Sequence, residues 1–160
     1  VQQLREAHYE RCVEALQFDE ADLTNKRRGA NAAAATTSAK AKQHFSTHHY
    51  RDQIASTVGA PPRAKMLRLA QEQSNLATAL PRSWSSTCFL RVDEQRMDVV
   101  QFLITGPEDT PYHGGVFQFD AFFPNDYPNT SPLVNLQTTG GGSVRFNPNL
   151  YNCGKVCLSL

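Results

Sequence analysis

The sequence has few cysteines and no long apolar run. Four cysteines among 160 residues are too few and too widely spread for the dense disulfide framework of small secreted domains, so we expect free thiols. No apolar stretch approaches the roughly 20 residues that a membrane span needs. With 16 basic and 15 acidic residues, the net charge of +1 favours neither nucleic acid nor an anionic membrane as a partner. We therefore expect a soluble, cytoplasmic protein without a nucleic-acid or membrane partner.

The length of 160 residues suits one domain of ordinary size, which can bury a core without disulfides or a structural metal. Residues 1–24 place apolar side chains at helical spacing and predict a helical N-terminal extension that ends near Leu23. Residues 25–59 predict a low-complexity linker and flank, because residues 25–43 are rich in alanine and contain basic but no acidic side chains. This linker is either a solvated insertion or a basic tether for an acidic partner. We expect residues 60–160 to form a partial core domain.

The clearest secondary-structure signals lie between residues 60 and 138. A stripe of apolar residues predicts a helix between Pro62 and Pro81. Alternating apolar and polar residues then predict four strands, over 88–92, 97–104, 117–123 and 133–138. The loops between them are too short for crossover helices, so the strands should run antiparallel. We therefore expect an α+β fold in which the N-terminal helix packs on a four-stranded antiparallel meander.

A cysteine and an asparagine near the end of the chain are candidates for chemistry. Cys157 lies on an irregular segment where a bulky partner could reach its thiol. Asn149 could return past the thiol if the residues between them loop out, and its amide would suit the oxyanion that forms when a nucleophile attacks a thioester. The alternative is that Asn147 and Asn149 only cap turns around Pro148 and that Cys157 is a small buried hydrophobe.

Two other interpretations of the cysteines and histidines are weaker. A zinc site could use Cys153, Cys157 and His113 with His48 or His49, but the two cysteines have three residues between them and no second pair follows. A papain-like hydrolase needs a histidine base oriented by a third group, yet no histidine follows Cys157. We interpret His48 and His49 as a polar, partly exposed pair and expect no metal site and no cofactor.

Several motifs, in a fixed order, resemble the ubiquitin-conjugating enzymes. They are Gly-Pro-Glu-Asp-Thr-Pro-Tyr-His-Gly-Gly-Val-Phe at 106–117, Phe-Pro-Asn-Asp-Tyr-Pro at 123–128, Asn-Pro-Asn at 147–149 and Gly-Lys-Val-Cys-Leu at 154–158. The resemblance covers about residues 60–160. Segments 145–152 and 155–159 are most similar to very large members in which ligase and conjugating functions share one chain. Relative to the family, the C-terminal helices that follow the nucleophile are absent from this chain, so we expect a fragment.

The resemblance implies a role for each matching residue. Cys157 takes the nucleophile position and would hold the C-terminus of ubiquitin as a thioester after transfer from the ubiquitin-activating enzyme in an ATP-dependent pathway. Asn149 would steady its turn and stabilise the oxyanion when a substrate lysine attacks. On the helix, the residues implied to bind the activating enzyme are Arg63, Lys65 and Arg68. In a loop, the residues implied to bind a ubiquitin ligase, or a ligase region of the same polypeptide, are Pro128 and Asn129. The alternative function is a non-catalytic ubiquitin-binding or ligase-supporting module of the same fold.

Overall fold

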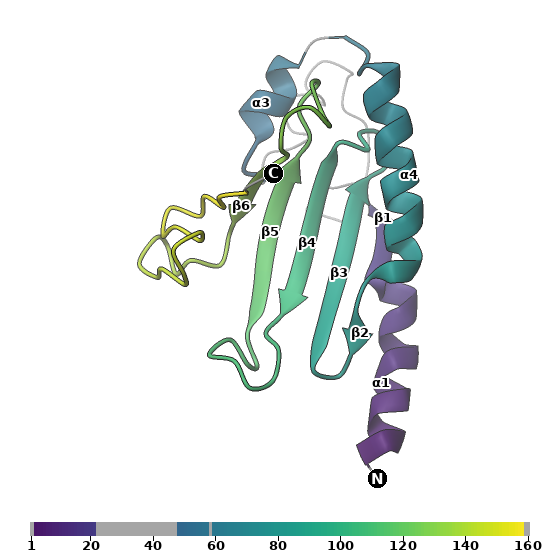
Figure 1. The fold of residues 1–160 in the computed structure, drawn as a ribbon, viewed down its shortest axis with the longest axis vertical. Helices are drawn as coiled ribbons and strands as arrows, with labels where there is room; N and C mark the ends of the chain where they lie inside the picture. Colours follow the sequence, from purple (N-terminus) through teal and green to yellow (C-terminus); the bar gives the residue numbers. More distant parts are fainter. Residues whose placement is uncertain (1, 22–47, 58, 159–160) are drawn as a thin grey trace, which may run out of the picture.

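The computed structural model describes residues 2–21, 48–57 and 59–158, and Figure 1 shows how their elements are arranged. The linker expected over residues 25–43 lies outside this part of the chain. In chain order the elements are α1 (Gln2–Gln17), β1 (Phe18–Ala21), α3 (Arg51–Ser56), α4 (Arg63–Ala79), β2 (Arg82–Ser83), β3 (Ser86–Asp93), β4 (Val99–Thr105), β5 (Val116–Phe122) and β6 (Leu133–Leu136).

The sheet is built around the antiparallel meander that the sequence predicts. Strands β3, β4, β5 and β6 are neighbours in chain order, and each neighbouring pair runs antiparallel, with Val92 opposite Val100 and Val100 opposite Ala121. Because side chains alternate between the two faces of a strand, these three residues and Leu90 share one face, where they form a buried apolar cluster. The α+β class and the four-stranded meander are confirmed.

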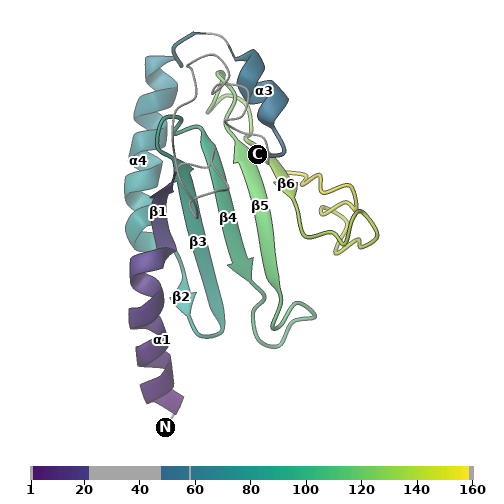
Figure 2. The same ribbon diagram turned by 180° about the vertical axis from the view of Figure 1, so that it is seen from behind.

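The N-terminal part of the chain adds a strand that the sequence analysis did not predict. The helix expected to reach Leu23, a residue outside the described part, ends already at Gln17, and β1 follows and pairs parallel to β3. β1 satisfies backbone groups that β3 would otherwise leave open at the sheet edge, and this pairing overrides the local helical pattern. Figures 1 and 2 both show α1 and β1 on the β3 side of the sheet. The N-terminal segment therefore extends the core sheet.

The helix predicted between the prolines is α4, and it is confirmed. It begins directly after Pro62, and Leu80 leaves the helix in an extended conformation before Pro81. Leu69 on its apolar stripe is buried, and Leu80 packs against the apolar cluster of the sheet. Both views show α4 running along the β3 side of the sheet (Figures 1 and 2). Apolar packing therefore holds the helix at Leu69 and directly after its end, whereas Leu76 of the same stripe is exposed.

A buried ion pair ties the start of α4 to the residue before β4. Lys65, with 0% of its side chain exposed, donates from Nζ to Oδ2 of Asp98 at 2.6 Å, and Arg96 donates to both oxygens of the same carboxylate at 2.9 and 3.0 Å. Burial would raise the pKa of Asp98, but the hydrogen bonds and charges of Arg96 and Lys65 outweigh it and lower that pKa. The expectation that Lys65 belongs to an exposed docking face is wrong, because its ammonium group is paired inside the protein.

Replacing Asp98 with alanine should destabilise the chain strongly. The Lys65 ammonium would stay buried without a carboxylate, and breaking a buried pair in this way costs about 3–5 kcal/mol. Chemical denaturation of Asp98→Ala measures the loss. Glu14→Ala is the matched control, because the Glu14–Arg82 pair is exposed and exposed pairs contribute less than about 1 kcal/mol. Equal losses in the two variants would contradict a special weight for the buried pair.

Residues 48–57, which include α3, pack onto the sheet instead of belonging to a linker. Tyr50 and Ile54 form a buried cluster with Val99 at the start of β4 and Phe122 at the end of β5. Val99 and Phe122 are opposite each other, one residue away from the pair Val100 and Ala121, so they lie on the other face of the sheet. The prediction of a linker and flank is wrong for these ten residues because they supply part of the core.

His48 anchors this segment, and the interpretation of His48 as partly exposed is wrong. The Tyr50 N–H donates to His48 Nδ1 at 3.2 Å, so the neutral ring carries its proton on Nε2, which lies 3.3 Å from the Val100 carbonyl oxygen and donates to it. The neighbouring His49 has an exposed side chain, and its N–H donates to Asp120 Oδ2 at 2.7 Å. Burial lowers the pKa of His48, outweighing the charge of Asp120, which raises it.

The lowered pKa of His48 should make the fold less stable in mild acid. Above about pH 6.5 the ring is neutral in both the folded and the unfolded chain, so its contribution is constant. Below that value the unfolded chain takes up the proton first, and the free energy of unfolding falls by up to about 1.4 kcal/mol per pH unit until the folded pKa is reached. Denaturation at several pH values should show that His48→Gln loses this component. His113→Gln, which changes an exposed ring, should keep it; the same pH slope in both variants would contradict the assignment.

Candidate active site

The chain returns to the edge of the sheet just before Cys157. After β6 the chain projects away from the sheet as a loop (Figures 1 and 2), and it comes back where the Leu136 N–H donates to the Gly154 carbonyl at 2.7 Å and the Val156 N–H donates to the Val134 carbonyl at 3.2 Å. Gly154 has a φ of 87°, and a Cβ there would lie 2.5 Å from the Leu136 carbonyl oxygen. Only glycine permits this close return. Cys157 is therefore fixed directly after a segment that is bonded to β6.

The turn at 147–149 brings Asn149 to Cys157. Asn147 Oδ1 accepts the N–H groups of Asn149 at 2.8 Å and Leu150 at 3.0 Å, which closes a turn around Pro148. The Cys157 N–H then donates to the Asn149 carbonyl oxygen at 3.0 Å. The structure thus joins the two residues that the sequence analysis paired, through their backbones.

Both side chains of this pair face solvent. Cys157 is a free, exposed thiol, and Asn149 is exposed. Within the described residues the Asn149 side chain makes no hydrogen bond, whereas the Asn147 side chain closes the turn. The alternative that Cys157 is a buried hydrophobe is wrong, and the capping role applies to Asn147. The exposed thiol and the uncommitted amide thus share one loop, and these groups have the chemistry to attack a thioester and to donate to the resulting oxyanion.

Three aromatic side chains support the turn from the sheet side, and the sequence analysis did not identify them. Phe146 packs edge-to-face against Phe117 with ring centroids 5.2 Å apart, and Phe117 packs in the same way against Tyr112 at 5.8 Å. The Tyr112 hydroxyl also donates to the Phe146 carbonyl at 3.3 Å. The signal was present as aromatic residues in the 106–117 motif and the 145–152 segment, but only the fold brings them together.

The predicted partner-binding residues, apart from the buried Lys65, lie on the surface. Arg63 and Arg68 are exposed on α4, and Pro128 and Asn129 are exposed in the loop after β5. Arg68 pairs with Glu72, and the hydrogen bond and charge of Glu72 raise the pKa of Arg68. The other oxygen of Glu72 accepts a hydrogen bond from the Tyr127 hydroxyl. This chain of contacts links the exposed side of α4 to the loop that carries Pro128 and Asn129.

The residues considered for zinc are not gathered in one place. His48 is buried against the sheet, while Cys153, Cys157 and His113 are exposed in loops. Across residues 2–21, 48–57 and 59–158, no group of three or more histidine, cysteine, aspartate or glutamate side chains is arranged to hold a metal ion. The His113 N–H donates to the Thr110 carbonyl at 3.1 Å, so His113 lies in a turn.

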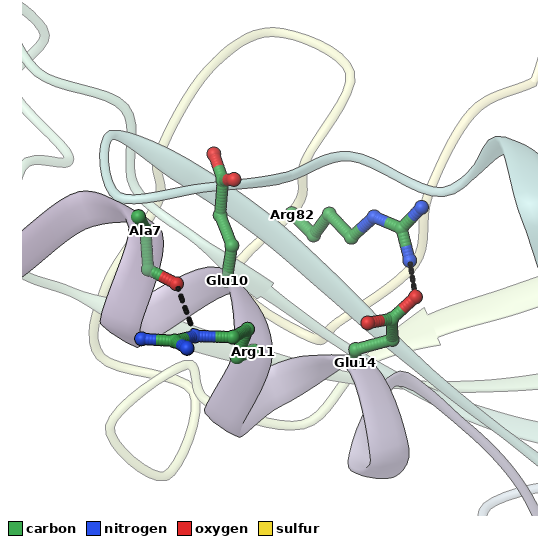
Figure 3. Close-up of a pocket in the computed structure, with 5 residues that line it drawn as sticks. All are labelled: Ala7, Glu10, Arg11, Glu14 and Arg82. Atoms are coloured by element: carbon green, nitrogen blue, oxygen red, sulfur yellow. Dashed lines mark hydrogen bonds and ion pairs between the residues drawn. The ribbon is translucent and has the colours of Figure 1, made fainter. Parts of the chain in front are cut away.

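A surface hollow of about 540 Å³ lies on the β3 side of the sheet, opposite the edge at which the Cys157 loop returns to β6 (Figures 1 and 2). Four residues of α1 and one of β2 line it: Ala7, Glu10, Arg11, Glu14 and Arg82. Figure 3 shows the Glu14–Arg82 ion pair at its side. It contains no residue of the Cys157 loop. Among the described helices, none combines the length and the apolar character needed to cross a membrane.

A family model described as ubiquitin-conjugating enzyme matches residues 68–160. The chain therefore belongs to the ubiquitin-conjugating enzyme family, as its motifs predict.

The chain is also similar to individual proteins, and it spans only a small part of the first two. It is 58% identical over 113 residues to the human protein named Dual E2 ubiquitin-conjugating enzyme/E3 ubiquitin-protein ligase BIRC6, a match that covers 71% of this chain and 2% of that protein. It is 50% identical over 98 residues to Probable ubiquitin-conjugating enzyme protein 17 of Caenorhabditis elegans, covering 61% of this chain and 14% of that protein. The structure of human ubiquitin-conjugating enzyme E2 G1 is 32% identical with a TM-score of 0.49, covering 63% of this chain and 75% of that one. The name of the human relative agrees with the predicted likeness to members that combine ligase and conjugating functions.

The two asparagines of the turn should behave differently when each is replaced. Asn147→Ala removes the side chain that accepts two backbone N–H groups, and we expect a loss of about 1 kcal/mol in the free energy of unfolding. Asn149→Ala removes a side chain without a bond inside the described residues, and we expect almost no loss. Chemical denaturation of both variants measures the difference. A larger loss for Asn149→Ala would show that its amide is part of the structure and is not free for a substrate.

Proposed function

We propose that this chain accepts ubiquitin from the ubiquitin-activating enzyme as a thioester on Cys157 and passes it to a substrate lysine. In the first step the Cys157 thiolate attacks the carbonyl carbon of the ubiquitin thioester, a new carbon–sulfur bond forms, and the thiolate of the activating enzyme leaves. In the second step a neutral lysine amine attacks the new thioester, an isopeptide bond forms, the Cys157 thiolate leaves, and the extra proton of the amine passes to solvent. The activating enzyme consumes the ATP, so this chain needs no cofactor.

The observation that carries the proposal is the bond between the Cys157 N–H and the Asn149 carbonyl oxygen at 3.0 Å. It keeps an exposed thiol and an exposed amide on one loop, where the C-terminal tail of another protein has access. The amide would donate to the negative oxygen that develops during lysine attack, a contact that is stronger in the transition state than in the starting thioester. Membership of the ubiquitin-conjugating enzyme family supports the same chemistry.

The partners follow from the same proposal. The activating enzyme would dock on the exposed side of α4 through Arg63 and Arg68, without Lys65. A ubiquitin ligase would contact the loop at Pro128 and Asn129. The human relative is named as both a conjugating enzyme and a ligase, which supports a ligase region of the same polypeptide as the partner. We place this activity in the cytoplasm.

The first step is tested by loading. The chain is incubated with activating enzyme, ubiquitin and ATP and analysed on a non-reducing gel, where we expect one ubiquitin adduct that reductant removes. The adduct should be absent in Cys157→Ala and unchanged in Cys153→Ala, which removes the other exposed thiol of the same loop. An adduct that persists in Cys157→Ala would refute the assignment. Failure to load together with retained ubiquitin binding would identify a non-catalytic module instead.

The second step is tested in the same experiment by adding free lysine after ATP has been removed. Asn149→Ala should load like the unchanged chain and lose its ubiquitin to lysine about 100-fold more slowly, the effect of removing one oxyanion donor. Asn152→Ala, which changes another exposed asparagine of the loop, should discharge at the normal rate. Equal discharge by Asn149→Ala and the unchanged chain would rule out the oxyanion role.

A further inference from the structure

Arg145 and Tyr151 flank the 147–149 turn and contact each other across it. The guanidinium carbon of Arg145 lies 5.1 Å from the centroid of the Tyr151 ring, and Arg145 Nη2 donates to the Pro148 carbonyl at 3.4 Å. Both side chains are exposed. Since the aromatic cluster of Phe146 lies on the sheet side of the turn, the Arg145–Tyr151 contact closes the turn from the solvent side.

Tyr151 also belongs to the segment that leads to the thiol. Its N–H donates to the Lys155 carbonyl at 3.0 Å, and its own carbonyl accepts the Gly154 N–H at 2.9 Å. One arm of the loop therefore holds Asn149, the other leads from Tyr151 to Cys157, and Arg145 contacts both. Apart from this side-chain contact, the two arms are joined by backbone bonds, of which the bond from Cys157 to Asn149 is nearest to the thiol.

A guanidinium group suits this place for two reasons. It is planar and weakly hydrated, so it can stack on an aromatic face while its N–H groups still donate to a carbonyl. It also presents several N–H donors in one plane, so the group can contact a ring and a carbonyl together. The side chain lies at the turn without being a nucleophile, an acid or a base.

We propose that Arg145 is a positioning residue for ubiquitin transfer: by stacking on Tyr151 and bonding to Pro148 it restricts the turn so that the Asn149 amide faces the thioester on Cys157. This inference rests on the proposed function of Cys157. Arg145 touches no reacting atom. Its loss widens the range of conformations of the Asn149 arm, so fewer of the loaded molecules present the oxyanion donor when lysine attacks.

The test measures discharge of ubiquitin from the preloaded chain to free lysine. Arg145→Gln and Tyr151→Ala should each load normally and discharge about two- to fivefold more slowly, the size expected from an exposed cation–π contact. The double variant should be no slower than Arg145→Gln alone, because Arg145→Gln already removes the stacking contact that Tyr151→Ala breaks. Tyr151→Phe, which keeps the ring face, should discharge at the normal rate. Lys155→Gln is the charge-matched control, because it removes an exposed cation of the same loop.

Three discharge results would overturn the inference. The first is an unchanged discharge rate in Arg145→Gln. The second is an equal slowing in Lys155→Gln, which would indicate a general charge effect. The third is a double variant in which the slowing factors of the two single variants multiply. A second measurement stands apart from the reaction: amide hydrogen exchange at Cys157, whose N–H bonds to Asn149, should be faster in Arg145→Gln and normal in Tyr151→Phe. If the unchanged chain forms no thioester, the proposed function fails, and the exchange result still decides whether Arg145 restrains the loop.

Discussion

The site depends on the return of the chain to β6 at Gly154. Two backbone hydrogen bonds, one to Leu136 and one to Val134 of β6, hold this return. A side chain at position 154 would collide with the carbonyl oxygen of Leu136. This contact places Cys157, because the cysteine is only three residues further along the chain. The thiol is therefore positioned by the sheet edge itself, even though it lies in a segment without regular secondary structure.

Around that contact the loop has two kinds of support. On the sheet side, Phe146 is held by aromatic packing and by the Tyr112 hydroxyl. On the solvent side, Asn147 closes the turn and Arg145 stacks on Tyr151. Neither support uses the Asn149 amide. Within the described residues the Asn149 side chain makes no hydrogen bond, so its amide is available for the oxyanion role that we propose.

Most of the fold could be predicted from local patterns. Period-two alternation indicated β3 to β6, and an apolar stripe between prolines indicated α4, because these signals lie within one element. The burial of Lys65 could not be predicted in this way, since a lysine at a helix start is usually solvated and only the fold places Asp98 against it. The same limit applies to β1, whose partner β3 is some seventy residues away, and to His48, which bonds to a carbonyl of β4.

The candidate site shows the same division between local and distant information. The motifs indicated Cys157 and Asn149, and the turn chemistry of Asn147 followed from its position before Pro148. Tyr112 is 34 positions from its bonding partner Phe146, so no sequence spacing relates the two. Arg145 and Tyr151 are near in sequence, but nothing in their spacing distinguishes a stacked pair from two solvated side chains.

The packing of residues 48–57 also has a practical consequence for where the folded unit begins. Asp120 is fully buried, and its two oxygens are satisfied by the His49 N–H at 2.7 Å and the Gln101 amide at 2.8 Å. A protein shortened to start at residue 60 would lose one of those donors and uncover Val99 and Phe122 on the outer face of the sheet. A buried carboxylate that lacks a hydrogen-bond donor, next to newly exposed apolar surface, favours aggregation. The smallest soluble unit should therefore include α3 and the histidine pair before it.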